Sequence, residues 1–323
     1  MSTVKLGTRG SQLALVQARM VAALIDGRTG TRCEEIIIKT SGDRLAEASL
    51  SEIGGKRLFV KEIEDALLAG EIDLAVHSSK DMPVVLPEGL VIGAVLPRED
   101  PRDAMILPGS APPYGSLDAI VRALGNGPRI GTSSVRRTAQ LARLFPKARF
   151  LPIRGNLDTR MRKLDSGDYD ALVLAAAGLR RLNHGHRVSA ALPLDACVPA
   201  PGQGIIAVEI RRDDEGMREQ VAAIGDASAA AALTAERAVV ERLGGGCQMP
   251  IGAHARVTEG TIHITGVVIS LDGERVVRAE ASGSTLDPAA AGIEAADRLL
   301  EGGADVILVE ARRATSVVEG LQP

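Results

Sequence analysis

The N-terminal part of the chain alternates short apolar runs with longer segments of helical periodicity, and this alternation constrains the fold most strongly. The run at residues 4–8 is followed by residues 11–25, in which apolar side chains recur at helical spacing: Leu13, Val16, Met20 and Leu24. The alternation repeats with a predicted strand at residues 35–39, a helix at 59–69 and a buried strand at 73–77. A strand–helix alternation of this kind predicts an α/β layer with parallel strands.

A second α/β unit is predicted beyond residues 108–128, which are rich in proline and glycine. Its predicted elements are a strand at 129–131, a helix at 135–145 and a strand–helix pair at 170–182. Residues 199–204 contain two prolines and two glycines, so we interpret this segment as a hinge through which the chain returns to the first unit.

The C-terminal part of the chain predicts a smaller α+β unit. A helix at residues 227–243 precedes two alternating segments, 261–271 and 274–281, which a turn at Asp272-Gly273 joins into a hairpin. A further helix at 287–300 is expected to cover the hairpin. Because 323 residues exceed the size at which one hydrophobic core keeps growing, we expect several domains.

The composition argues against several classes of protein. A net charge of -3 and an aromatic content of 2%, without tryptophan, disfavour nucleic-acid binding, which relies on basic surfaces and aromatic stacking. No apolar run approaches the roughly 18 residues that span a bilayer, and the N-terminal segment lacks a signal-peptide core, so we expect a cytoplasmic protein. The three cysteines are far apart and the histidines show no metal-ligand spacing, so neither a disulfide framework nor a metal site is expected.

The segment from His77 to Pro83 follows a predicted strand and contains hydroxyl groups, an ammonium group and a carboxylate, at Ser78, Lys80 and Asp81. Ligands of open α/β sheets bind outside the carboxyl ends of the strands, so this segment is a candidate site. The alternative is a polar turn in which Asp81 caps a helix or pairs with Lys80.

Residues 131–137 join a predicted strand to a predicted helix, an arrangement that presents backbone N–H groups and hydroxyls to an anion. Ser134 precedes two adjacent arginines, Arg136 and Arg137, which cannot lie on one helical face. We therefore expect one of them to extend into solvent while the other reaches the binding site. A simple helix cap with two solvated arginines is the alternative.

Further arginines follow other predicted strands: Arg9 with Ser11, Arg154, Arg160, and the pair Arg180-Arg181. Arginine forms planar bidentate pairs with carboxylates, so a ligand with many carboxylates would explain this distribution. A phosphate ligand would explain it almost as well, and solvated surface arginines are the third interpretation.

Cys247 follows three glycines in a loop where the backbone allows close approach of another group. Free cysteines are more often buried and inert, a description that fits Cys33 and Cys197 better. Cys247 is therefore the candidate reactive thiol.

Taken together, six motifs resemble the porphobilinogen deaminase family, also called hydroxymethylbilane synthase, over nearly the whole chain. They are residues 7–14, Gly54-Gly55-Lys56 before Leu58-Phe59, residues 77–81, residues 98–103, residues 131–134 before Arg136-Arg137, and Gly245-Gly246-Cys247. The resemblance implies three domains: residues 1–101 with 202–222, residues 102–201, and residues 223–323. The first two would form the lobes of a fold similar to two-lobed type II periplasmic binding proteins, with the active cleft between them, and the third would carry the cofactor loop.

The resemblance also implies the chemistry. Cys247 would hold a dipyrromethane primer through a thioether, and the primer would be elongated by four porphobilinogen units with loss of ammonia before water releases hydroxymethylbilane. Asp81 would be the catalytic residue, and a monomer is expected. The cofactor contacts implied are Ser78, Lys80, Asp81, Ser134, Arg136 and Arg137. The substrate contacts implied are Arg9, Ser11, Gln17, Lys56, Phe59, Arg154, Arg160 and Arg181.

The chain departs from the family pattern at Arg57, where glycine would be expected, and in residues 108–128, which are longer than usual. Without the resemblance, the arginines would also suit a two-lobed binding protein for a polyanionic small molecule. A nucleic-acid binder using Arg136-Arg137 and Arg180-Arg181 is the third hypothesis.

Overall fold

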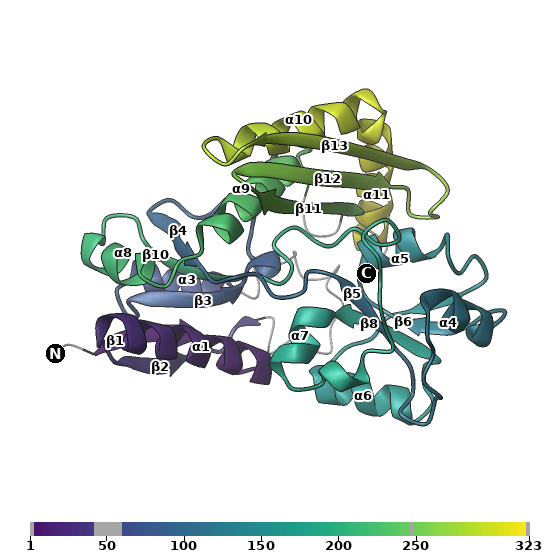
Figure 1. Cartoon of the computed structure of the whole chain (residues 1–323), viewed down its shortest axis with the longest axis horizontal. Helices are drawn as coiled ribbons and strands as arrows, with labels where there is room; N and C mark the ends of the chain where they lie inside the picture. The colour runs from purple at the N-terminus through teal and green to yellow at the C-terminus, as the bar shows by residue number, and fades with distance from the viewer. Residues whose placement is uncertain (1–2, 42–59, 246–248, 321–323) are drawn as a thin grey trace.

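The computed structural model describes residues 3–41, 60–245 and 249–320, and these residues form three β-sheets with helices packed against them (Figure 1). Two sheets are mixed and have five strands each, and the third is antiparallel with three strands. The predicted α/β character of the first two units and the antiparallel sheet of the third are confirmed.

The first sheet has the strand order β2-β1-β3-β10-β4. Its strands are β1 (Val4–Thr8), β2 (Cys33–Ile37), β3 (Leu74–Ser78), β4 (Leu90–Val95) and β10 (Ile206–Arg211). One face packs against α1 (Gln12–Thr29) and α8 (Glu215–Ala222), and the other against α3 (Lys61–Leu68). β1 is parallel to β2 and β3, as predicted, whereas β10 runs antiparallel between β3 and β4 on its return from the second unit.

The second sheet has the strand order β7-β6-β8-β5-β9. Its strands are β5 (Asp103–Ile106), β6 (Arg129–Gly131), β7 (Arg149–Leu151), β8 (Ala171–Ala175) and β9 (Ala190–Ala191). One face packs against α6 (Leu157–Asp165) and α7 (Ala176–Arg181), and the other against α4 (Leu117–Leu124) and α5 (Val135–Leu141). Short 3-10 helices, η2 (Ser79–Asp81) and η3 (Gly185–Arg187), follow β3 and α7.

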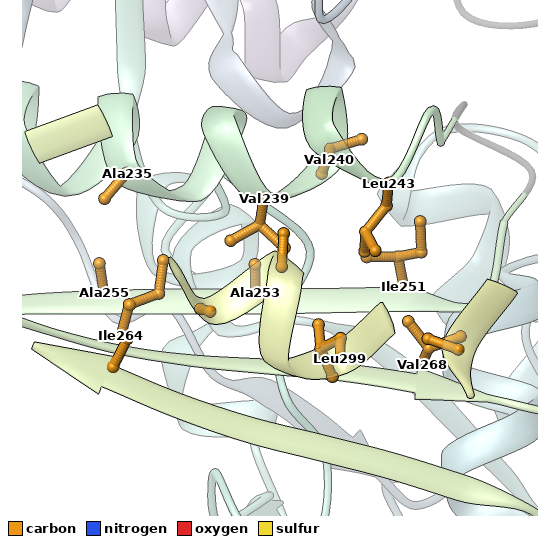
Figure 2. Packing of buried hydrophobic residues seen from close by; sticks show 14 of the residues in the cluster. Ala235, Val239, Val240, Leu243, Ile251, Ala253, Ala255, Ile264, Val268 and Leu299 are labelled. Atoms are coloured by element: carbon orange, nitrogen blue, oxygen red, sulfur yellow. The ribbon is translucent and has the colours of Figure 1, made fainter. Parts of the chain in front are cut away.

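The third sheet consists of β11 (Ile251–Thr258), β12 (Thr261–Ile269) and β13 (Val276–Ser284). The helices of this unit are α9 (Ala227–Arg242), α10 (Pro288–Glu301) and α11 (Ala304–Gly320). β12 and β13 are the predicted hairpin, and Figure 2 shows the apolar core between this sheet and its helices. Helices α9 and α10 pack closely because Gly292 has no Cβ, which would lie 2.1 Å from the carbonyl oxygen of Ala235.

The buried carboxylate of Glu236 on α9 joins the third unit to the two segments that connect the five-stranded sheets. It accepts hydrogen bonds from Arg98 Nη1 at 2.5 Å, Gly202 N at 2.7 Å and Ala255 N at 2.6 Å. Arg98 and Gly202 belong to the two segments that connect the five-stranded sheets, and Ala255 belongs to β11. Burial alone would raise the pKa of Glu236, but Arg98 and His254 outweigh this effect and lower it.

Removal of this carboxylate should destabilise the protein. We expect Glu236→Ala to lower the free energy of unfolding by about 3 kcal/mol, because it leaves the largely buried Arg98 without its partner. Chemical denaturation would measure the loss. Glu294→Ala, which removes an exposed pair with Arg298, is the control and should cost about 0.5 kcal/mol or less. Equal losses in the two variants would contradict the role of Glu236.

The lowered pKa of Glu236 adds a pH dependence. The carboxylate's contribution to stability should be complete above the ordinary pKa of glutamate and should disappear as the pH falls through the lowered folded-state value. The free energies of unfolding of the wild type and of Glu236→Ala, measured by denaturation, should therefore converge as the pH falls.

Candidate functional site

The segment after β3 carries the candidate catalytic acid. Ser78 ends β3, and Ser79, Lys80 and Asp81 form η2, which is attached to the second connecting segment by a hydrogen bond from Ser79 N to Ile205 O of 3.0 Å. Asp81 is half-buried and receives no hydrogen bond from the described residues. No helix begins at residues 82–89, so the predicted alternative in which Asp81 caps a helix is wrong.

Gln17 holds Ser78 in place from α1. The amide of Gln17 donates to Ser78 Oγ at 2.8 Å, and the hydroxyl donates to Gln17 Oε1 at 3.0 Å. Gln17 is buried, and Ser11 caps the same helix by accepting a hydrogen bond from Ala14 N at 3.3 Å. Helix α1 therefore fixes the end of the strand from which Lys80 and Asp81 project.

Lys80 lies in a strongly charged environment. Burial lowers its pKa to about 8; Asp81 and Asp103 oppose this shift, whereas Arg137 and Arg136 add to it. Asp81 belongs to the first unit, and the two arginines belong to α5 of the second. The carboxyl end of β3 therefore faces the start of α5 across the boundary between the two five-stranded sheets.

Arg136 and Arg137 are both buried, so the expectation that one would extend into solvent is wrong. Both turn toward Asp103, the first residue of β5: Arg136 Nη1 lies 2.7 Å from Oδ2, and Arg137 Nε lies 2.9 Å from Oδ1. Their long side chains bend to a common acid although their Cα atoms lie on different helical faces. Ser134 caps α5 by accepting a hydrogen bond from Arg137 N at 3.4 Å.

The other predicted arginines are arranged around this centre. Arg160 donates from Nε to Gly155 O at 2.9 Å, and burial lowers its pKa, as does Arg137, whereas Asp81 opposes the shift. Arg154 is half-buried and forms no ion pair within the described ranges. Arg160 thus lies near the catalytic candidate, with Arg154 close to it in sequence.

Arg181 occupies the boundary between the units. Its Nη2 donates to Gly204 O at 2.7 Å, and burial lowers its pKa while Glu99 opposes the change. Its buried Nε has no hydrogen-bond partner among the described residues. Arg9 is half-buried directly after β1. The structure therefore brings Lys80, Asp81, Arg136, Arg137 and Arg160 into one electrostatic cluster, and Arg181 lies beside the connecting segments.

Three predicted site residues, Lys56, Phe59 and Cys247, lie outside the described residues, as do Arg57 and the rest of residues 42–59. The other two cysteines have thiols of raised pKa. Burial followed by the charge of Asp103 raises the pKa of Cys197 to about 12, and burial with Asp26 raises that of Cys33. Both agree with the prediction that they are inert.

Two other kinds of feature are absent from the described ranges. These residues hold no group of three or more histidine, cysteine or acidic side chains suited to a metal ion. None of their helices is both long and apolar enough to cross a lipid bilayer.

Two family models and two relatives that match this chain carry the same name. The family model "Porphobilinogen deaminase, dipyromethane cofactor binding domain" matches residues 4–219, and "Porphobilinogen deaminase, C-terminal domain" matches residues 230–301. The porphobilinogen deaminase of Moorella thermoacetica is 48% identical over 321 residues, covering 99% of this chain and 100% of the relative. That of Syntrophobacter fumaroxidans is 45% identical over 312 residues, covering 96% and 98%.

Solved structures give only a distant likeness. The methionine binding protein MetQ is 13% identical, covers 69% of this chain and 88% of its own, and has a TM-score of 0.42.

Proposed function

The chain belongs to the porphobilinogen deaminase family, and from this premise we propose that it is a transferase that condenses four porphobilinogen molecules into hydroxymethylbilane with release of ammonia. Its cofactor is dipyrromethane, which the description of the matched N-terminal domain names. The observation that carries the proposal is the surplus of positive charge around Asp81.

This surplus suits a ligand with many carboxylates. Each pyrrole of the substrate carries an acetate and a propionate, and these repel one another unless cations lie between them. Among the described residues, Asp81, Asp103, Arg136 and Arg137 act on Lys80, and Asp81 and Arg137 act on Arg160, so this cluster contains four cations and two acids. Four positive charges against two negative charges leave two positive charges uncompensated in a largely buried environment. The residues therefore suit an anionic ligand such as a dipyrromethane, and the two charges would compensate two of its four carboxylates.

The individual ligand contacts are proposals on the same basis. Lys80, Arg136 and Arg137, with the hydroxyls of Ser78 and Ser134, would hold the cofactor's acid groups. Arg9, Ser11, Gln17, Arg154, Arg160 and Arg181 would hold the pyrroles that are added. Lys56 and Phe59 are proposed from the sequence alone.

Asp81 is the proposed catalytic residue. Its carboxylate can accept hydrogen bonds from pyrrole N–H groups, assist the departure of the amine and stabilise the positive charge that develops on the pyrrole. No described residue donates a hydrogen bond to its oxygens. A carboxylate held at the end of η2 would lower the energy of the positively charged pyrrole without forming a covalent bond.

We propose Cys247 as the attachment point of the dipyrromethane. A thioether requires a thiol that can ionise and that a ligand can reach. The pKa of about 12 and the burial of Cys197 disfavour it, and the raised pKa of Cys33 disfavours that residue. When bound, the dipyrromethane supplies the pyrrole carbon to which the first substrate is joined.

Incubation of the purified protein with porphobilinogen tests the function directly. We expect stoichiometric release of ammonia and a linear product that cyclises to uroporphyrin. Intact-protein mass should exceed that of the sequence by one dipyrromethane. A polyanion-binding protein would retain the ligand without releasing ammonia and would have the mass of its sequence.

The domain boundaries, the monomeric state and the cytoplasmic location also remain proposals. Residues 1–101 with 202–222, residues 102–201 and residues 223–323 each include one of the three sheets, which supports the division. Limited proteolysis would test the boundaries, sedimentation would test the monomer, and cell fractionation would test the location.

A further inference from the structure

Asp103 is a buried acid for which the proposed reaction mechanism has no assigned role. Its carboxylate is completely buried at the start of β5 and receives donors from three directions. Oδ1 accepts from Arg137 Nε and Gln203 Nε2, both at 2.9 Å, and Oδ2 accepts from Arg136 Nη1 at 2.7 Å and Cys197 Sγ at 3.3 Å. Burial would raise the pKa of Asp103, but Arg136 and Arg137 outweigh it and hold the pKa well below its usual range.

The carboxylate makes it possible to bury two adjacent cations. Arg136 and Arg137 would repel each other in a setting of low dielectric, and an anion between them offsets that repulsion. Backbone carbonyls complete the arrangement, since Arg136 Nη1 also donates to Val198 O at 2.6 Å and Arg137 Nη1 to Val173 O at 3.0 Å. Each guanidinium is therefore held in one orientation.

Asp103 also connects this arrangement to the boundary between the units. Gln203, which is fully buried in the second connecting segment, donates from Nε2 to Asp103 and to Pro101 O at 2.7 Å. Asp103 itself directly follows the first connecting segment. The orientation of the two guanidinium groups therefore depends on the segments that connect the two five-stranded sheets.

We propose that Asp103 is a positioning residue for the transfer reaction, aligning the guanidinium groups of Arg136 and Arg137 beside Lys80 and Asp81. The proposal rests on the proposed function, since it assigns the aligned arginines to the carboxylates of the pyrrole chain. Asp103 does not touch the reacting atoms. It preserves the geometry of the cations and, as one of two acids facing Lys80, supports the protonated form of that amine.

The effect on Lys80 provides a readout that a purely structural role would not give. Among the described residues, Asp81 and Asp103 raise the pKa of Lys80, and Arg137 and Arg136 lower it; Asp81 also acts on Arg160. Loss of the Asp103 charge leaves the two arginines less compensated. Lys80 should then lose its proton at lower pH, and the acid groups of the cofactor would lose the charge of one of the cations proposed to hold them.

The test compares the wild-type enzyme carrying its primer with Asp103→Asn, measuring kcat and KM for porphobilinogen between pH 6 and pH 9. We expect the alkaline decline of kcat/KM to move to lower pH by about one unit. KM should rise about tenfold, because the misaligned arginines hold the acid groups of the attached primer less well and displace the pyrrole to which porphobilinogen is joined. Asp103→Glu keeps the charge but displaces it, so we expect a raised KM with the wild-type pH profile.

Asp170→Asn is the matched control. It removes the acidic partner of an arginine in the same unit. Asp170 directly precedes β8, and its Oδ1 lies 2.7 Å from Nη2 of Arg129, the first residue of β6. Its pH profile and KM should equal those of the wild type. Thermal unfolding would show whether each variant is folded.

If Asp103→Asn does not fold, Gln203→Ala provides a second test, because it removes one donor to Asp103 Oδ1. This variant should still raise KM severalfold, and an unchanged KM would overturn the proposal.

A folded Asp103→Asn with the pH profile and KM of the wild type would overturn the positioning role alone. Absence of ammonia release by the wild type would instead overturn the proposed function, and the positioning role with it. The two failures are therefore distinguishable in one set of measurements.

Discussion

Asp81→Ala should leave the fold intact and lower the turnover of porphobilinogen by about two to three orders of magnitude, equal to roughly 3 to 4 kcal/mol. The size of this decrease follows from the loss of a preoriented carboxylate that faces developing positive charge. Asp81 is half-buried at the end of a short 3-10 helix and forms no ion pair with the described residues within salt-bridge distance, so its removal disrupts little structure. Steady-state ammonia release by the variant with its primer attached would measure the effect.

Asp81→Asn separates charge from shape in this prediction. The amide has the size of the carboxylate but cannot offset a positive charge, so its turnover should fall nearly as far as that of the alanine variant. Asp213→Ala removes an exposed acid next to α8 and should retain normal turnover. Near-normal rates in Asp81→Ala or Asp81→Asn would exclude Asp81 from the chemistry.

The location of the site followed from local patterns in the sequence. Apolar periodicity placed β1, α1 and β3, and the rule that ligands bind at the carboxyl ends of strands selected the segment with Lys80 and Asp81. Helix-capping residues behaved as their types suggest, with Ser11 and Ser134 capping α1 and α5. These features depend on neighbouring residues, which is why the sequence alone predicts them.

Other features depend on contacts between distant residues, and for these local patterns were insufficient. The antiparallel direction of β10 depends on where the chain re-enters the first sheet. Strand β11 was not predicted, because its alternation of small apolar with polar residues is weak. The common partner of Arg136 and Arg137 lies 33 positions before the first of them, and helical geometry alone sends the two side chains in different directions.

The buried acids illustrate the same limit. Asp103 and Glu236 have the residue type of a surface acid, and no property of their immediate neighbours distinguishes them. Only the folded chain shows that Asp103 collects two arginines and that Glu236 collects donors from both connecting segments and from β11.

Cys247→Ser should abolish turnover and remove the mass of one dipyrromethane from the protein. A serine hydroxyl does not ionise near neutral pH, so the thioether cannot form and the growing chain has no anchor. Intact-protein mass spectrometry before and after incubation with porphobilinogen would measure attachment, and ammonia release would measure turnover. Catalysis should fall to the detection limit, since every elongation step proceeds from the attached primer.

Cys33→Ser is the control that isolates the role of the attachment point. Cys33 is a half-buried thiol at the start of β2, so its replacement changes the cysteine count without affecting the proposed site. This variant should keep both the additional mass and the turnover. If Cys247→Ser retained the additional mass, the primer would be attached elsewhere. If wild-type protein lacked that mass after incubation and still released ammonia, the reaction would proceed without a covalent primer, and the cationic cluster around Asp81 would have to hold the growing chain by ion pairs alone.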